Sequence, residues 1–115
     1  MIVAPNLRVF LAPGTTDLRK SINGLSALVE EELKLDPFTG YLFGFCDKGR
    51  DLVKLLYWDR NGFALWMKRL EKDRFNWPDA TGGILDLTGR ELRWLFDGLD
   101  WKRPAFAALT YQFTG

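Results

Sequence analysis

Lysine and arginine side chains gather in the middle of this 115-residue chain, between runs of aromatic residues. Residues 48–74 carry eight basic side chains against four acidic ones, a net charge of +4 where the whole chain has +1. Basic side chains neutralise phosphates and aromatic rings stack on nucleobases, so this combination favours nucleic-acid binding. The alternative is that the charges are solvated sheet positions and the rings form the core. The candidate DNA-binding residues are Lys48, Arg50, Lys54, Arg60, Lys68, Arg69, Lys72 and Arg74, with Arg19 and Lys20 as additions.

Enzyme chemistry has little support in the sequence. The chain has no histidine and one cysteine, which leaves no His-based triad, no His general base and no zinc site. Cys46 falls in a strand pattern and is expected to be a buried, inert thiol. Asp47, Asp51 and Asp59 have the oxygen ligands that Mg²⁺ accepts, but Asp59 follows a different strand and should lie at the opposite end of the sheet. We therefore expect no catalytic activity, no metal site and no cofactor.

The candidate cations lie on a predicted antiparallel meander. Three runs rich in aromatic and β-branched residues, Tyr41–Cys46, Leu52–Trp58 and Phe63–Leu70, are separated by short polar turns. Asn61 and Gly62 in the second turn tolerate the positive φ that a tight hairpin requires. The pattern predicts three neighbouring strands joined by hairpins.

Two of the cations, Lys54 and Lys68, stand inside apolar runs of this meander. Burial of a lysine without a partner is costly, and its aliphatic stem lets the charge reach outward. We therefore expect both ammonium groups to reach either solvent or a carboxylate.

Further elements are expected on both sides of the meander. Leu7–Leu11 alternates like a strand, and apolar residues at helical spacing predict an amphipathic helix over about Leu18–Leu33. After the meander, Arg74–Pro78 is expected to extend the sheet briefly, and Ile84–Leu87 to form a short strand. The candidate N-caps of the helix are Thr15, Thr16 and Asp17.

A second helix is predicted towards the C-terminus, where Thr88 and Glu91 match a capping box and Gly98 is a candidate end. We expect a single α+β domain over residues 1–115, with a core at about 7–99 and a tail, 100–115, strapped to the body. Its fold would be an antiparallel meander sheet of four to six strands packed by two amphipathic helices. The lone cysteine and the lack of a signal sequence or apolar span predict a cytoplasmic location.

Three successive acids, Glu30, Glu31 and Glu32, lie near the end of the first predicted helix, where the helix dipole disfavours them. One interpretation is a solvated acidic face. The other is a binding site for a basic partner protein.

A series of short motifs runs along the chain in a fixed order. They are Thr16–Leu25, Asp36–Gly40, Lys54–Asp59, Gly62–Phe63, Lys68–Glu71, Phe75 and Trp77–Pro78. With these motifs the chain resembles the TnpB accessory proteins of IS66-type insertion sequences, which are unrelated to the RNA-guided nuclease of the same name. The resemblance implies a role in DNA transposition beside a DDE-type transposase and supplies no catalytic residues. The tail after Asp100 departs from the family pattern.

Together, the cations and the resemblance predict a non-catalytic accessory protein that binds transposon DNA through a basic aromatic sheet. The alternative is an adaptor that binds the DDE-type transposase, with Glu30–Glu32 as the partner site, and does not contact DNA. Neither hypothesis involves a membrane.

Overall fold

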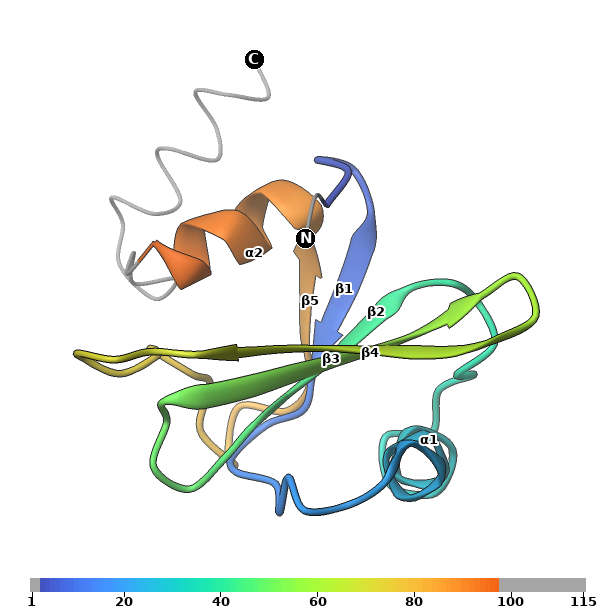
Figure 1. Cartoon of the computed structure of the whole chain (residues 1–115), viewed down its shortest axis with the longest axis horizontal. Coiled ribbons are helices and arrows are strands. Elements are labelled where there is room, and N and C mark those ends of the chain that lie inside the picture. The colour runs from blue at the N-terminus through green and yellow to red at the C-terminus, as the bar shows by residue number, and fades with distance from the viewer. Residues whose placement is uncertain (1–2, 98–115) are drawn as a thin grey trace.

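Two helices pack on opposite faces of one five-stranded sheet (Figure 1). The structure, a computed structural model, describes residues 3–97. The elements are β1 (Arg8–Leu11), α1 (Ile22–Glu31), β2 (Leu42–Cys46), β3 (Leu52–Asp59), β4 (Gly62–Arg69), β5 (Leu85–Thr88) and α2 (Gly89–Phe96).

The sheet has the strand order β4-β3-β2-β1-β5 and is mixed. The predicted antiparallel meander is confirmed as β2, β3 and β4, with Asp59 opposite Gly62 at the hairpin. The expectation of a purely antiparallel sheet is wrong, because β1 and β2 pair in parallel. The long connection between these two strands contains α1 and returns the chain in its original direction, as a strand–helix–strand crossover does.

Each face of the sheet has its own hydrophobic layer. On one face, Leu25 and Val29 of α1 are fully buried against side chains that include Phe43. On the other, Leu92 and Leu95 of α2 pack on the alternate residues of the same strands. Complete burial of an aliphatic side chain of this size contributes about 1.5–3 kcal/mol to the stability of the fold, so these contacts hold both helices firmly against the sheet.

The first helix is shorter than predicted. It begins at Ile22 because the Ser21 hydroxyl accepts a hydrogen bond from the Gly24 amide at 3.2 Å, which makes Ser21 the N-cap. None of the three predicted caps has this role, and Leu18 is buried from the turn before the helix. The helix ends at Glu31 rather than near Leu33.

The segment after β4 does not extend the sheet as expected. Phe75 and Trp77 are buried in the α2-side core, and the Trp77 indole donates a 2.8 Å hydrogen bond to the carbonyl of Ala12. Because Trp77 is anchored in the core, this loop is held against the sheet without joining its ladder.

The last elements agree closely with the sequence pattern. Strand β5 is displaced by one residue from the prediction, and the capping box of Thr88 and Glu91 is present. The predicted end at Gly98 and the tail at 100–115 lie outside the described residues. Within residues 3–97, neither helix is long and apolar enough to cross a membrane.

Candidate nucleic-acid interface

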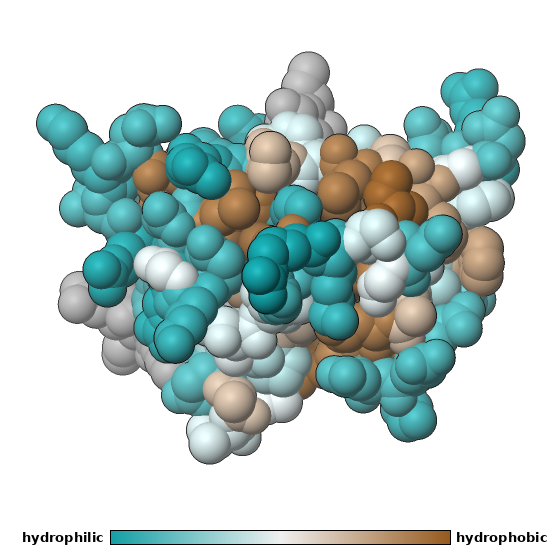
Figure 2. Space-filling view, turned by 60° about the horizontal axis from the view of Figure 1, so that its bottom comes forward, coloured by the Kyte–Doolittle hydropathy of each residue, from teal (hydrophilic) through white to brown (hydrophobic). Residues whose placement is uncertain are grey.

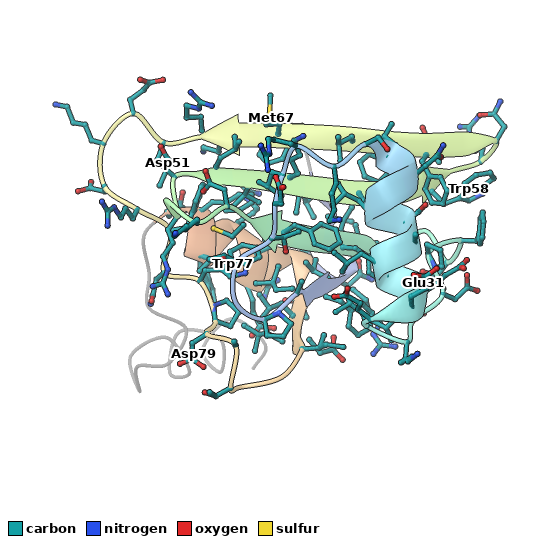
Figure 3. The ribbon with its side chains drawn as sticks, turned by 90° about the horizontal axis from the view of Figure 1, so that it is seen from below. Glu31, Asp51, Trp58, Met67, Trp77 and Asp79 are labelled. Atoms are coloured by element: carbon teal, nitrogen blue, oxygen red, sulfur yellow. The ribbon has the colours of Figure 1, made fainter. Side chains whose placement is uncertain are left out.

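Five of the eight candidate DNA-binding cations meet at one end of the sheet. The β2–β3 turn and the chain leaving β4 are joined there by two backbone hydrogen bonds, Leu70 N–H to Asp51 O at 2.8 Å and Phe75 N–H to Arg50 O at 2.7 Å. Asp51 marks this end in Figure 3. We call this cluster the basic end, and its members, all exposed, are Lys48, Arg50, Arg69, Lys72 and Arg74.

The charges of the basic end are available to a ligand. Within residues 3–97 the ion pairs are Arg8–Asp86 and Arg19–Asp17, both at 2.8 Å, so no member of the basic end is neutralised by a described side chain. Four acids, Asp47, Asp51, Glu71 and Asp73, belong to the same segments and reduce the local net charge to +1. The surface is therefore moderately basic, which suits a few phosphate contacts rather than many.

The other three candidate cations lie elsewhere. Arg60 is at the tip of the β3–β4 hairpin, roughly 23 Å from the basic end by the length of β3. Lys68 is exposed on the α2 face, with its ammonium 5.7 Å from the centre of the Phe96 ring. Lys54 is on the α1 face, so the sequence prediction grouped side chains that the sheet separates.

The outcomes for the two strand lysines differ. Lys68 reaches solvent as expected. Lys54 is partly buried, and its ammonium donates a 2.6 Å hydrogen bond to the backbone carbonyl of Leu18, not to a carboxylate. Lys54 is thus neither fully buried nor unpaired, and it has a partner that the expectation did not name, a carbonyl oxygen from the turn before α1.

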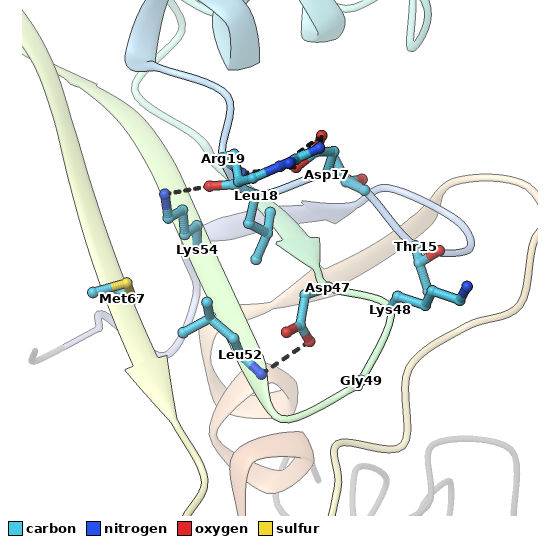
Figure 4. A pocket seen from close by; sticks show the side chains of 11 residues that line it. Thr15, Asp17, Leu18, Arg19, Asp47, Lys48, Gly49, Leu52, Lys54 and Met67 are labelled. Atoms are coloured by element: carbon cyan, nitrogen blue, oxygen red, sulfur yellow. Dashed lines mark hydrogen bonds and ion pairs between the residues drawn. The ribbon is translucent and has the colours of Figure 1, made fainter.

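A pocket of about 560 Å³ surrounds Lys54, between the β2–β3 turn and the turn that precedes α1 (Figure 4). Leu18, Leu52 and Met67 supply apolar lining, and Met67 remains 59% exposed. Figure 2, turned towards the α1 side, shows hydrophobic surface between hydrophilic side chains. We call this site the Lys54 pocket; its remaining lining residues are Thr15, Thr16, Asp17, Arg19, Asp47, Lys48 and Gly49.

Sequence reasoning did not find the Lys54 pocket. Its walls come from three chain segments, and the residues around Leu18 were assigned to the helix. The sequence did contain one indication of the pocket. Two of the motifs that carry the family resemblance, Thr16–Leu25 and Lys54–Asp59, each contribute residues to its lining.

Both acids of the Lys54 pocket are already engaged. Asp17 is held by the Arg19 guanidinium, whose hydrogen bonds lower the pKa of the Asp17 carboxyl well below its usual range. Asp47 accepts hydrogen bonds from the backbone amides of Asp51 and Leu52, each at 3.2 Å. These carboxylates therefore shape the pocket rim and do not pair with Lys54.

The residues considered for enzyme chemistry are dispersed. Asp59 ends β3 at the hairpin, whereas Asp47 and Asp51 flank the turn at the opposite end, as expected from the strand pattern. Cys46 is fully buried, and burial raises the pKa of its thiol to about 12, so the thiol stays protonated at neutral pH.

The three acids proposed as a partner site are exposed at the end of α1, with Glu32 as its C-cap. Figure 3 places Glu31 on the same side of the view as Trp58, away from Asp51. Near the hairpin the rings of Phe38, Trp58 and Phe63 contact one another with centroids 5.1–5.3 Å apart. The acidic residues and the basic end therefore occupy different ends of the molecule.

The fold and site define a small α+β protein with a mixed sheet, a pocket, and beside it a set of cations that form no ion pair within residues 3–97. The chain belongs to the family described as IS66 Orf2 like protein, whose model matches residues 7–106. It is 40% identical over 99 residues to the uncharacterized protein y4hO of Sinorhizobium fredii, covering 86% of each chain. It is 39% identical over 97 residues to y4jC of the same organism, covering 84% of this chain and 83% of that one. No solved structure matches the chain.

Membership in this family implies an accessory role in transposition, in association with the transposase of the element. The resemblance seen in the sequence motifs is thereby confirmed.

Proposed function

We propose that this protein is a non-catalytic accessory factor that binds transposon DNA through the basic end. The observation that carries the proposal is the set of five exposed cations, drawn from two tied loops, that have no ion-pair partner within residues 3–97. Unpaired Lys and Arg side chains at one end of a rigid sheet meet phosphates without first breaking an internal salt bridge. Family membership supports the transposition context.

Binding at the basic end has a measurable salt dependence. Each neutralised phosphate contributes about −0.9 to the slope of log affinity against log salt for duplex DNA, so ~4 contacts give a slope of about −3.6. Removing one contacting cation weakens binding to all sequences and makes the slope less steep by about one unit. The folded state is little affected, because exposed substitutions usually change stability by less than ~0.5 kcal/mol.

The test compares Arg69→Gln and Arg74→Gln with the control Arg60→Gln in salt-titrated binding to a blunt duplex. Arg69 and Arg74 belong to the basic end, whereas Arg60 carries the same charge at the hairpin. We expect the first two variants to lose affinity and slope and the control to retain both. Equal losses in all three variants would mean general electrostatic attraction and would contradict an interface at this end.

The adaptor hypothesis predicts a different result. Its supporting observation is that Glu30, Glu31 and Glu32 are exposed at the end of α1, separate from the basic end. An adaptor would show no DNA affinity above background at low salt but would capture the transposase. Replacement of the three glutamates by glutamine would abolish that capture, with the arginine variants silent.

The non-catalytic part of the proposal is tested separately. Asp59 lies at the opposite end of β3 from Asp47 and Asp51, so the three carboxylates cannot share one Mg²⁺ ion. We expect the purified protein not to cut DNA with Mg²⁺ or Mn²⁺. Cleavage that persists through purification and disappears in Asp51→Asn or Asp59→Asn would overturn this expectation.

A further inference from the structure

The Lys54 pocket contains a cation without a counter-ion. The Lys54 ammonium is partly buried and donates to the Leu18 carbonyl at 2.6 Å, and it makes no ion pair within the described part of the chain. An ammonium has three donor hydrogens, so this carbonyl uses one of them. Partial removal of a charge from water is costly unless an opposite charge compensates. The site therefore favours an anionic group next to Lys54.

The carboxylates of the pocket do not meet this need. Asp17 is bound by Arg19, and Asp47 by two backbone amides. The second cation of the pocket is Lys48, which also belongs to the basic end. The pocket is thus continuous with the surface proposed to contact DNA, and its uncompensated charge is positive.

The remaining lining is apolar. Met67 lies directly across the sheet ladder from Lys54, and Leu18 and Leu52 complete a hydrophobic surface beside the ammonium (Figure 4). A methionine side chain left 59% exposed next to a pocket offers a polarizable surface for a flat ring. The volume of about 560 Å³ is within the range of pockets that hold small organic groups, about 300–1,000 Å³.

We propose that the Lys54 pocket binds one unpaired nucleotide, with its phosphate at Lys54 and Lys48 and its base against Leu18, Leu52 and Met67. This inference rests on the proposed DNA binding and adds to it the form of DNA that is recognised. A base stacked within a duplex cannot enter a pocket, so the site selects a single strand, an overhang or an extruded base.

The test uses a blunt duplex and the same duplex with a short single-stranded overhang. We expect the wild-type protein to bind the overhang form more tightly. Lys54→Gln removes the charge and retains an N–H donor, so the ratio of the two affinities should fall about tenfold, the effect of losing one charge-assisted hydrogen bond. Lys34→Gln removes an exposed lysine outside the pocket and should leave the ratio unchanged.

A second readout reports on the pocket itself. The chain has two methionines, so a sample with ¹³C-labelled methionine methyl groups gives two signals, and Met67→Leu identifies the one from the pocket. We expect a saturable shift of the Met67 signal with a trinucleotide and with the overhang duplex, and a much smaller shift with the blunt duplex.

The outcomes separate this inference from the proposed function. If blunt and overhang duplexes bind equally, or if Met67 does not shift, the nucleotide pocket is refuted while duplex binding at the basic end stands. If no form of DNA binds, both are refuted. A Met67 shift with an oligoglutamate peptide but not with the trinucleotide would show that the pocket takes an acidic polypeptide, and would overturn the nucleotide assignment.

Discussion

Replacement of Gly44 by alanine tests how the loop behind the basic end is anchored. Gly44 lies in β2, between β1 and β3, and faces the α2-side core. A Cβ atom added there would lie 2.6 Å from a Leu11 methyl, 3.2 Å from a Leu55 methyl and 3.2 Å from the Trp77 ring. The missing side chain thus makes room for Trp77, which holds the segment that follows Lys72 and Arg74.

The expected cost follows from those contacts. Overfilling a packed core costs about 1–3 kcal/mol, and the reduced entropy of the unfolded alanine chain offsets about 0.4–1 kcal/mol of this. We therefore expect Gly44→Ala to lower the free energy of unfolding by about 1–2 kcal/mol. Each kcal/mol of stability lost should lower Tm by about 4–8 °C. With a urea m-value of about 2 kcal/mol/M, in the middle of the usual range, the urea midpoint should fall by about 0.5–1 M.

The assay is urea unfolding followed by circular dichroism, with Gly62→Ala as the matched control. A Cβ atom at Gly62 meets no other atom within 4 Å, and Gly62 does not have a positive φ. The control should be as stable as the wild type or slightly more stable. If Gly44→Ala and Gly62→Ala unfold at the same midpoint with unchanged m-values, Trp77 does not depend on the space left by Gly44, and this account of the anchor is refuted.

Two further predictions concern buried groups. Trp77→Phe removes the indole donor and leaves the carbonyl of Ala12 without its 2.8 Å partner, so the free energy of unfolding should fall by about 1–3 kcal/mol; urea unfolding of the variant checks this. Burial raises the pKa of Cys46 to about 12, whereas the unfolded thiol has a pKa of about 8.5, so its contribution to stability is present below about pH 8.5 and is lost as the pH rises towards 12. Cys46→Ala should therefore lessen the alkaline fall in stability, and the wild-type thiol should resist alkylation at pH 8 until urea unfolds the chain; rapid alkylation of the native protein would contradict this.

Local patterns in the sequence were sufficient to predict the meander. A hairpin is specified by its own turn and by the alternation beside it, and the Asp59–Gly62 turn joins β3 and β4 as predicted. The positive φ of this turn falls at Arg60 (58°), however, and not at Asn61 or Gly62 as expected. The parallel pairing of β1 with β2 was missed. A long connection can join parallel or antiparallel strands, and parallel pairing is indicated only once the helix within the connection is recognised as the crossover of a strand–helix–strand unit. The early start assigned to α1 has a similar cause: Leu18 fits the helical period but is buried from a turn.

The candidate site was only partly predictable for a physical reason. Residue types show that Lys54 and Lys68 are cations but not where they point. Lys54 of β3 pairs with Met67 of β4, so Lys68, one residue further along β4, lies on the opposite face of the sheet. The length of β3 separates Arg60 from the basic end. The partner of Lys54 is a backbone carbonyl, which no pattern of side chains can reveal. Charge counting along the chain therefore grouped cations that lie on different faces and at different ends of the sheet.

The separation of charge along the molecule bears on the two candidate functions. The basic end is formed by the β2–β3 turn and the loop after β4. Glu30–Glu32 lie at the end of α1, and Figure 3 shows Glu31 on the same side as Trp58 and away from Asp51. A ligand at one end would leave the other uncovered, so DNA binding and transposase binding are compatible in one molecule. Simultaneous binding would then require little internal movement, because both helices are fixed to the sheet by fully buried side chains. Charge substitutions at one end should consequently change one affinity and leave the other intact, whereas coupled losses would require the two partners to share a surface.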